Sequence, residues 1–293
     1  EEWCMASYSQ PAAADAATRD KLWMLKDAGA NCGDGIFVLN GHNWRTVVAK
    51  ARAAEAEARR ELPFVIQEYI EKPELWEGRF KYHIRMYIVL RADMGVYLHH
   101  RALVHVANKP FSTTQDELED TQVHLTNVSK NLHNTELFHG CPIIDVQQYF
   151  GPERFERLRN SLGAAFRAAQ PFMVHQVNGD DFAHIGADIM LDDSGHPYLL
   201  ECNIPPCIGN YNAEMLPEQL EFFHNLFDSM VARFVEAPLL GSPGCGAAGS
   251  WIELQAPREE FRPAAGPMRG LNSLAWKLRE RRAAEASATA ILI

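Results

Sequence analysis

Apolar residues in the first part of the chain fall into short runs separated by turns and by one helical stretch. The run LWMLK at 22–26 precedes AGANCGDG, whose glycines favour a flexible turn, and the β-rich run IFVLN follows at 36–40. Residues 46–62 are rich in alanine, arginine and glutamate and carry one apolar stripe, which predicts a surface helix. The run FVIQEYI at 64–70 predicts a further strand.

Two longer runs alternate in the manner of antiparallel strands. They are YHIRMYIVL at 82–90 and GVYLHHRALVHV at 95–106, with the short turn RAD between them. Side chains two positions apart on such strands share a face. The polar, turn-rich stretch 108–137 predicts a surface loop or lid.

The second half of the chain predicts two helices with a hairpin between them. Residues 152–169 and 214–235 have helical patterns, with apolar residues of the first at three-to-four spacing. Between them, HIGADIML and PYLLECNI are two strand-like runs joined by DDSGH, a loop that contains glycine.

A change in composition near residue 237 suggests the domain boundaries. We expect a core at 1–237, a glycine-, serine- and proline-rich linker at 238–250, and a tail at 251–293. The tail contains RGLNSLAWKLRERRAAEA, a short basic amphipathic helix suited to docking on the core or on a partner.

Composition narrows the class of protein. Of the 293 residues, 47% are hydrophobic and 23% charged, as in a globular protein with a sizeable core. The formal charge of −10 argues against a broad nucleic-acid or anionic-membrane surface, so we expect neither partner. No long uncharged apolar run, secretory signal pattern, CxxC pair or zinc-finger spacing is present. We therefore expect an intracellular, soluble chain whose start at Glu1 indicates missing upstream residues.

Oxygen-bearing side chains gather on the predicted hairpin. Asp188 lies on its first strand, and Glu201 and Asn203 lie two apart on its second, hence on one face. Magnesium in proteins is commonly held by one or two carboxylates, with water and phosphate completing its shell. The same residues also fit a plain strand end and a turn before Pro205, and that alternative stays open on these residues alone.

Basic residues accompany several of the predicted strands. Lys26 precedes the glycine-rich turn, where exposed backbone amides and a lysine suit a phosphate. Lys81 and Arg85 lie four apart on one strand face and suit phosphate or carboxylate. Gln67, Glu68, Tyr69 and Ile70 end a strand whose backbone suits an adenine edge. Each feature alone also fits a solvated hairpin or strand.

Four segments in order resemble the tubulin tyrosine ligase-like family. They are LWMLKDAGANCGDGI, VIQEYIEKPELWEGRFKYHIRMYIVL, HLTNVSKN and GADIMLDDSGHPYLLECNIPP, and the resemblance covers roughly residues 21–230. It implies an α/β (α+β) ATP-grasp fold with mostly antiparallel sheets and flanking helices, in which two lobes hold ATP. From the resemblance we expect that the family's region preceding the lysine loop is missing upstream of this sequence.

The resemblance also implies an activity. Family members join tyrosine, glutamate or glycine to a protein carboxylate, typically of a tubulin tail, by way of an acyl phosphate. ATP and Mg²⁺ are the implied cofactors, and a free amino acid and the acidic tail of tubulin or microtubules are the implied partners. The implied location is the cytoplasm and cytoskeleton, including the cilium or basal body. The amino acid, and whether a side chain is initiated or elongated, stay open.

Carried over position by position, the resemblance assigns roles to twelve residues. Lys26 and Lys81 match nucleotide-binding lysines, Lys26 beside the flexible loop, and Arg85 matches an arginine near the phosphate and the incoming amino acid. The remaining matches are Gln67, Glu68, Tyr69 and Ile70 for adenine, Thr126 and Asn127 for an ATP-site pair, and Asp188, Glu201 and Asn203 for magnesium. Arg85 and Lys26 are the expected catalytic residues.

Three positions depart from the family pattern. His83 stands where the family usually has an acidic residue, His105 where it has an arginine, and Cys32 in a usually basic loop position. Imidazole does not supply arginine's permanent charge or its bidentate fork. The alternatives are therefore a catalytically weakened member that binds ATP or microtubules, or a ligase that acts on a non-tubulin protein or a small molecule.

Overall fold

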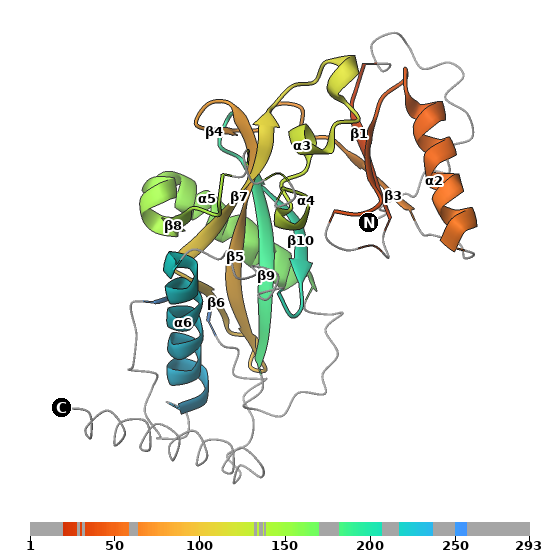
Figure 1. Ribbon diagram of the computed structural model, residues 1–293. Coiled ribbons are helices and arrows are strands. Elements are labelled where there is room, and N and C mark those ends of the chain that lie inside the picture. The colour runs from red at the N-terminus through yellow and green to blue at the C-terminus, as the bar shows by residue number, and fades with distance from the viewer. Residues whose placement is uncertain are drawn as a thin grey trace, which may run out of the picture. The chain divides into compact units, whose positions relative to one another are not determined.

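The described part of the chain forms two compact units. The computed structural model describes residues 20–27, 30, 33–58, 64–131, 134, 137, 139–169, 182–206, 217–236 and 250–256 (Figure 1). Unit 1 takes Glu1–His83, His105–Gly140 and Leu191–Gly195, and unit 2 takes Ile84–Val104, Cys141–Met190 and His196–Ile293. Among the helices of these described ranges, none has the length and apolar character that a membrane crossing requires.

Unit 1 contains a three-stranded antiparallel sheet. Its strands are β1 (Trp23–Asp27), β2 (Ile36–Leu39) and β3 (Phe64–Glu68), in the order β2-β1-β3. Helix α2 (Trp44–Ala58) lies beside this sheet (Figure 1), and its Val47 and Ala51 pack with Leu25. The strands and the helix that the hydrophobic pattern predicted here are confirmed, with the helix beginning two residues earlier, and residues 59–63 lie outside the described residues.

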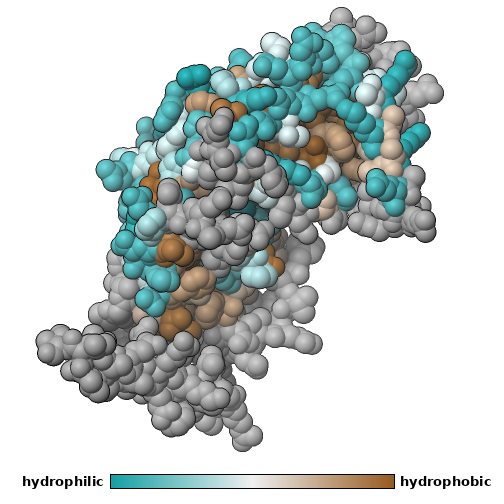
Figure 2. All heavy atoms as spheres, viewed as in Figure 1, coloured by the Kyte–Doolittle hydropathy of each residue, from teal (hydrophilic) through white to brown (hydrophobic). Residues whose placement is uncertain are grey.

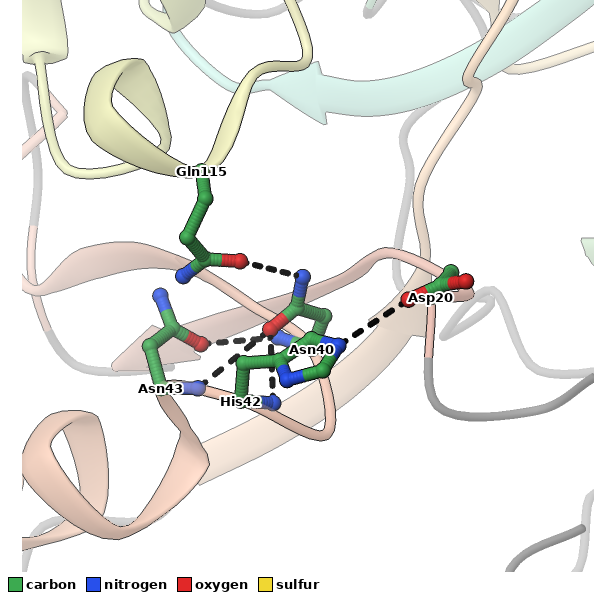
Figure 3. Close-up of polar contacts among 5 residues, drawn as sticks. All are labelled: Asp20, Asn40, His42, Asn43 and Gln115. Carbon is green, nitrogen blue, oxygen red and sulfur yellow. Dashed lines mark hydrogen bonds and ion pairs between the residues drawn. The ribbon is translucent and has the colours of Figure 1, made fainter. Parts of the chain in front are cut away.

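A side-chain network fixes the turn that enters α2. The Asn40 and Asn43 side chains each accept a backbone N–H from the other residue, at 3.3 and 2.8 Å, and Asn40 Oδ1 also accepts the His42 N–H (Figure 3). The amide of Asn40 donates to Gln115 Oε1 at 3.0 Å, while His42 Nε2 lies 3.0 Å from Asp20 Oδ1. These bonds satisfy backbone donors that a helix start leaves over.

The stretch expected to be a loop or lid is more ordered than predicted. Strand β7 (Arg101–Pro110) enters it, and η1 (Gln115–Glu117), α3 (Thr121–His124) and α4 (Val128–Asn131) follow. Asp120 caps α3 by accepting the Gln122 N–H at 2.9 Å. Leu118 is buried against Leu22, Val38 and Tyr69. The loop prediction is wrong for these residues, because a helix cap and the buried side chains of Leu118, Val123 and Leu125 order a polar segment.

An eight-stranded sheet runs in the order β10-β9-β5-β6-β11, with β4, β7 and β8 branching from it. Its strands are β4 (Leu75–Trp76), β5 (Phe80–Arg91), β6 (Val96–His99), β7, β8 (Ile143–Asp145), β9 (Phe182–Leu191), β10 (Pro197–Asn203) and β11 (Trp251–Gln255). The single strand expected at 95–106 is two strands, because the backbone N–H and C=O of His100 bond to Ser250 and Val146 instead.

Aromatic side chains form the core of unit 2. Helix α6 (Pro217–Val231) places Phe222, Phe223 and Leu226 against Tyr87 and its neighbours on the sheet. Helix α5 (Val146–Ala169) contains the predicted helix 152–169 as its second part, and Gly151, at φ 67°, separates the two parts. A short π-helical segment, Ala232–Glu236, follows α6.

The core extends beyond the boundary expected at residue 237. Strand β11 pairs with β6, Trp251 is buried, and its Nε1 donates to Ser229 Oγ at 3.0 Å. A strand of the sheet therefore follows the glycine-rich stretch, at residues that the composition assigned to a tail. Residues 238–249 and the predicted basic helix at 269–286 lie outside the described residues.

Candidate functional site

A buried lysine is the most unusual cation of unit 1. Lys81 lies on β5 with 3% of its surface exposed. Burial, and after it the positive charge of Lys26 on β1, lowers the pKa of its amine to about 7. The structure thus brings together, within unit 1, the two lysines that the sequence analysis singled out. A pair of neighbouring cations in a partly dry place favours an anion such as phosphate.

Tyr69 and His124 bond in series to Lys81. Lys81 Nζ donates to the Tyr69 hydroxyl at 2.7 Å, and that hydroxyl lies 2.8 Å from His124 Nδ1. Lys81 Nζ also lies 4.1 Å from the centre of the Tyr69 ring, which adds a cation–π contact. The sequence analysis assigned only the backbone of Tyr69 and did not select His124, although His124 begins the segment HLTN. Its position in that segment was the one feature of the sequence that could have pointed to His124.

The residues expected to contact adenine end the edge strand β3. Tyr69 N donates to Leu22 O at 3.1 Å, toward β1. Successive residues of a strand point their backbone groups to opposite sides, so those of Glu68 and Ile70 point away from β1, toward the open edge. The Glu68 carboxylate pairs with Lys21 at 2.9 Å. Backbone donors and acceptors are thus available at this edge.

The segment HLTN touches the glycine-rich turn. Gly33 has φ 81°, and a Cβ placed there would lie 2.9 Å from Asn127 Oδ1. An ion pair joins Asp34 to Lys130, in the helix that follows Asn127. The turn is held against this segment by a close approach that only glycine permits. Cys32 lies outside the described residues.

Two histidines stand beside Thr126 in the interior of unit 1. His83 Nδ1 lies 2.5 Å from Thr126 Oγ1, and the rings of His83 and His105 meet edge to face with centroids 4.6 Å apart. His83 and His105 are 4% and 5% exposed, respectively. The two positions that depart from the family pattern are therefore neighbours, and imidazole rings occupy them where charged side chains were expected.

In unit 2, Arg85 and Asp188 form a buried bidentate pair. The residues are register partners on β5 and β9, and Arg85 Nη2 donates to Asp188 Oδ2 at 2.9 Å while Nε bonds to Oδ1. The Arg85 chain passes over Gly186, where a Cβ would lie 3.1 Å from Arg85 Cδ. Asp188 thus keeps its negative charge in the interior through a fork-shaped partner.

The remaining expected metal ligands lie on β10. Asn203 Nδ2 donates to Glu201 Oε1 at 3.0 Å, so the two side chains share a face as predicted. Burial raises the pKa of the Cys202 thiol, and the negative charges of Asp188 and Glu201 raise that pKa further. The hairpin brings the three oxygen-bearing residues into one region of unit 2.

The donor set, which consists of oxygen atoms, suits a hard divalent ion such as magnesium. Among the residues that the structure describes, no three histidine, cysteine or acidic side chains converge on one point. A metal held here would have two carboxylates and one amide oxygen, and the remaining positions would fall to water and phosphate, which is the coordination that Mg²⁺ prefers. Asp188, Glu201 and Asn203 are therefore side chains of the types that bind Mg²⁺.

Comparison with solved structures identifies the fold. The C-terminal domain of K. lactis Pby1, described as an ATP-grasp enzyme, matches with a TM-score of 0.52 and 21% identity, over 83% of this chain and 64% of that one. The chain therefore has the ATP-grasp fold, a fold that in general uses ATP and a divalent metal. The expected α/β fold class with mostly antiparallel sheets is confirmed.

Sequence comparisons narrow this class to one family. The model of the tubulin-tyrosine ligase family matches residues 2–240. The chain belongs to the tubulin-tyrosine ligase family.

Its curated relatives are tubulin-modifying enzymes by name. The probable tubulin polyglutamylase ttll-9 of Caenorhabditis elegans is 23% identical over 235 residues, which are 76% of this chain and 54% of that protein. The mouse tubulin monoglutamylase TTLL4 is 26% identical, over 66% of this chain and 17% of its own length. The mouse tubulin polyglutamylase TTLL7 is 27% identical, over 65% and 22%. The chain thus spans at most about half the length of these three relatives.

Proposed function

We propose that this chain is an ATP- and Mg²⁺-dependent ligase that joins an amino acid to a carboxylate of a tubulin tail. The observation that supports the proposal is the position of Asp188 on β9 and of the hydrogen-bonded Glu201 and Asn203 on its neighbour β10, in a chain of this family. The named relatives are glutamylases, which favours glutamate over tyrosine and glycine as the amino acid.

The proposed reaction has two steps. In the first, an oxygen of the acceptor carboxylate attacks the γ-phosphorus of ATP, the bond to the β-phosphate oxygen breaks, and ADP leaves. In the second, the amine of the amino acid attacks the carbonyl carbon of the acyl phosphate, phosphate leaves, and the nitrogen loses a proton. Charge builds on phosphate oxygens throughout, so fixed cations supply most of the stabilisation.

Each proposed residue has a role that fits its surroundings. Lys26 and Lys81 would bind phosphate oxygens, and the backbone of residues 67–70 would bind the adenine edge. Thr126 and Asn127 would contribute polar groups to the nucleotide. In unit 2, Asp188, Glu201 and Asn203 would hold Mg²⁺, which neutralises phosphate charge when bound. Arg85 would act on the phosphate and on the incoming amino acid.

Calorimetry with Mg²⁺ and ATP on the complete protein tests the first half of the proposal. We expect Glu201→Gln to weaken nucleotide binding at least about tenfold, because one carboxylate charge is lost from the metal group. Glu218→Gln, which removes a carboxylate from the first turn of α6, is the control and should bind as the wild type does. Wild-type protein without any ATP binding would refute the proposal.

Incorporation of labelled amino acid into tubulin tests the second half. Glutamate, tyrosine and glycine are supplied separately with ATP, and the product is digested to locate the new bond. We expect glutamate on the acidic tail of tubulin, with no incorporation by Glu201→Gln. ATP hydrolysis without tubulin labelling would move the acceptor to a non-tubulin protein or a small molecule.

A second candidate function is binding without turnover. The buried contact between His83 and His105, where the family pattern has charged residues, favours it. A member of this kind would bind ATP or microtubules and localise to the cytoskeleton. Cosedimentation with microtubules that survives Asp188→Asn and Glu201→Gln would support it, whereas amino acid incorporation by the wild type would exclude it.

A further inference from the structure

A chain of hydrogen bonds in unit 1 leads from a backbone carbonyl to the Lys81 amine. Glu117 O lies 3.1 Å from His124 Nε2, His124 Nδ1 lies 2.8 Å from the Tyr69 hydroxyl, and that hydroxyl lies 2.7 Å from Lys81 Nζ. The side chains of Tyr69, Lys81 and His124 belong to residues that are at most 4% exposed. No water can replace a lost partner easily at this depth, so each bond matters.

The direction of every bond in this chain follows from chemistry. A carbonyl oxygen only accepts, so His124 Nε2 must carry a hydrogen to bond with Glu117 O. Burial lowers the pKa of His124 to about 4, with the charge of Lys81 as the next cause, so the ring is neutral at neutral pH. Its Nδ1 then has no hydrogen and accepts from the Tyr69 hydroxyl. The Tyr69 oxygen is left with lone pairs alone for Lys81.

This polarity has a consequence for the lysine. An ammonium group has three N–H donors and no acceptor, so it matches an oxygen that can only accept. A neutral amine has a lone pair that needs a hydrogen-bond donor, and the Tyr69 oxygen does not supply one. The chain therefore favours the charged form of Lys81, against the burial that favours the neutral form. One donor is directed at Tyr69, which orients the others.

Among the described residues, the Lys81 amine bonds to the Tyr69 hydroxyl and pairs with no carboxylate. Tyr69 already belongs to an apolar cluster with Leu22, Val38 and Leu118. The charged group acting on Lys81 is Lys26, from β1, and it is a second cation. Glu117 and Asp120 act on the far member of the chain, His124. A buried amine that faces another cation is suited to an anionic ligand that lies against both.

We propose that Tyr69 and His124 are positioning residues that hold the Lys81 amine, charged and oriented, for a nucleotide phosphate. His124 acts through Tyr69 and not by its own contact with the ligand. This inference rests on the proposed ATP function for the identity of the ligand, but the state of Lys81 is measurable without any nucleotide.

The test is an NMR titration of the nucleotide-free, complete protein labelled with [ε-¹³C]lysine. The Lys81 signal is assigned as the one lost in Lys81→Arg. In Tyr69→Phe the ring face remains and the hydroxyl is lost, and we expect the titration midpoint of Lys81 to fall by about one pH unit, because the ammonium loses its acceptor. Tyr97→Phe, which removes a hydroxyl from unit 2, is the control and should leave the midpoint unchanged.

The part played by His124 is tested in two backgrounds. His124→Leu should lower the midpoint in the wild type, because the freed Tyr69 hydroxyl can then donate to a neutral amine. In Tyr69→Phe the same substitution should change nothing further. An equal fall of the Lys81 midpoint on His124→Leu in both backgrounds would overturn the proposal. So would a Tyr69→Phe single variant whose Lys81 midpoint does not fall.

A conservative variant guards against misfolding. His124→Asn keeps an acceptor oxygen near the place of Nδ1, so we expect its midpoint to stay near that of the wild type. If His124→Leu does not fold, His124→Asn is the deciding variant. A fall of about one pH unit in its Lys81 midpoint would refute the action of His124 through Tyr69.

Nucleotide binding separates the two proposals. Tyr69→Phe should weaken ATP binding by about tenfold at neutral pH, since less of Lys81 is charged and correctly placed. If the wild type binds no ATP, the proposed function fails, and the NMR midpoints still show whether Tyr69 and His124 hold Lys81.

Discussion

Gly186 on β9 lies where a side chain would collide with two neighbours. A Cβ at this position would be 2.7 Å from Pro206 Cβ and 3.1 Å from Arg85 Cδ. Carbon atoms in contact are normally about 3.5 to 4.0 Å apart, so the first approach is too close by about 1 Å. Gly186→Ala must therefore displace the segment that follows β10, and it also presses on the Arg85 side chain.

The size of the effect depends on whether Arg85 also yields. Overpacking of a well-packed interior costs about 1 to 3 kcal/mol. If Arg85 moves enough to release Asp188, a buried carboxylate loses its partner, and breaking such a pair costs about 3 to 5 kcal/mol. We expect a loss of unfolding free energy of about 1 to 3 kcal/mol when only Pro206 yields, and a larger loss when Arg85 also does.

Urea denaturation followed by circular dichroism measures this loss, and Gly163→Ala is the matched control. Gly163 lies in helix α5, and its added Cβ would meet only the far end of the Arg167 side chain, at 3.1 Å. Alanine is favoured over glycine in a helix by about 0.8 to 1 kcal/mol, so the control should be neutral or more stable than the wild type. Equal stability of the two variants would refute the packing argument at Gly186.

Three further predictions concern other parts of the chain. Gly33→Ala should destabilise the protein by about 1 to 3 kcal/mol in urea, because φ is 81° and the added Cβ has no room, whereas Gly78→Ala, at φ 69° with open space, should lose only the smaller backbone share. The pKa of Lys81 is about 7 in the folded protein and higher in the unfolded chain. The cost of burying the charged amine is therefore full below about pH 7, and it shrinks as the pH rises from about 7 toward the pKa of the unfolded chain. Stability should therefore rise over that interval, and Lys81→Met should flatten the rise in denaturation curves recorded at several pH values. Trp251→Phe should cost about 1 kcal/mol from its lost bond to Ser229, and the loss should shrink in a Ser229→Ala background.

The strands were predictable because their patterns are local. The runs that became β1, β2 and β9 carry apolar residues bounded by turn residues. The positions of the two lysines in unit 1 were likewise indicated by their strands. These features need only the sequence within a few residues of each element.

Features that depend on distant partners were missed. Strand β11 follows a glycine-rich stretch and gains its place from β6, far away in sequence. His124 becomes a member of the Lys81 chain only because Tyr69, 55 residues earlier, reaches it. The bond between His83 and Thr126 spans 43 residues. The hydrophobic pattern around each of these residues does not indicate its partner.

The two histidines bear on the choice between ligase and binding protein. A charged pair in the interior must recover a large desolvation cost through good geometry, whereas imidazole rings packed edge to face carry no permanent charge to desolvate. His83 and His105, with Thr126 as a hydrogen-bond partner of His83, can therefore fill this place without loss of fold. Amino acid incorporation then distinguishes an altered substrate site from a lost one. The decisive comparison is thus between incorporation by the wild type and by a variant that restores the family's residues, His83→Asp with His105→Arg.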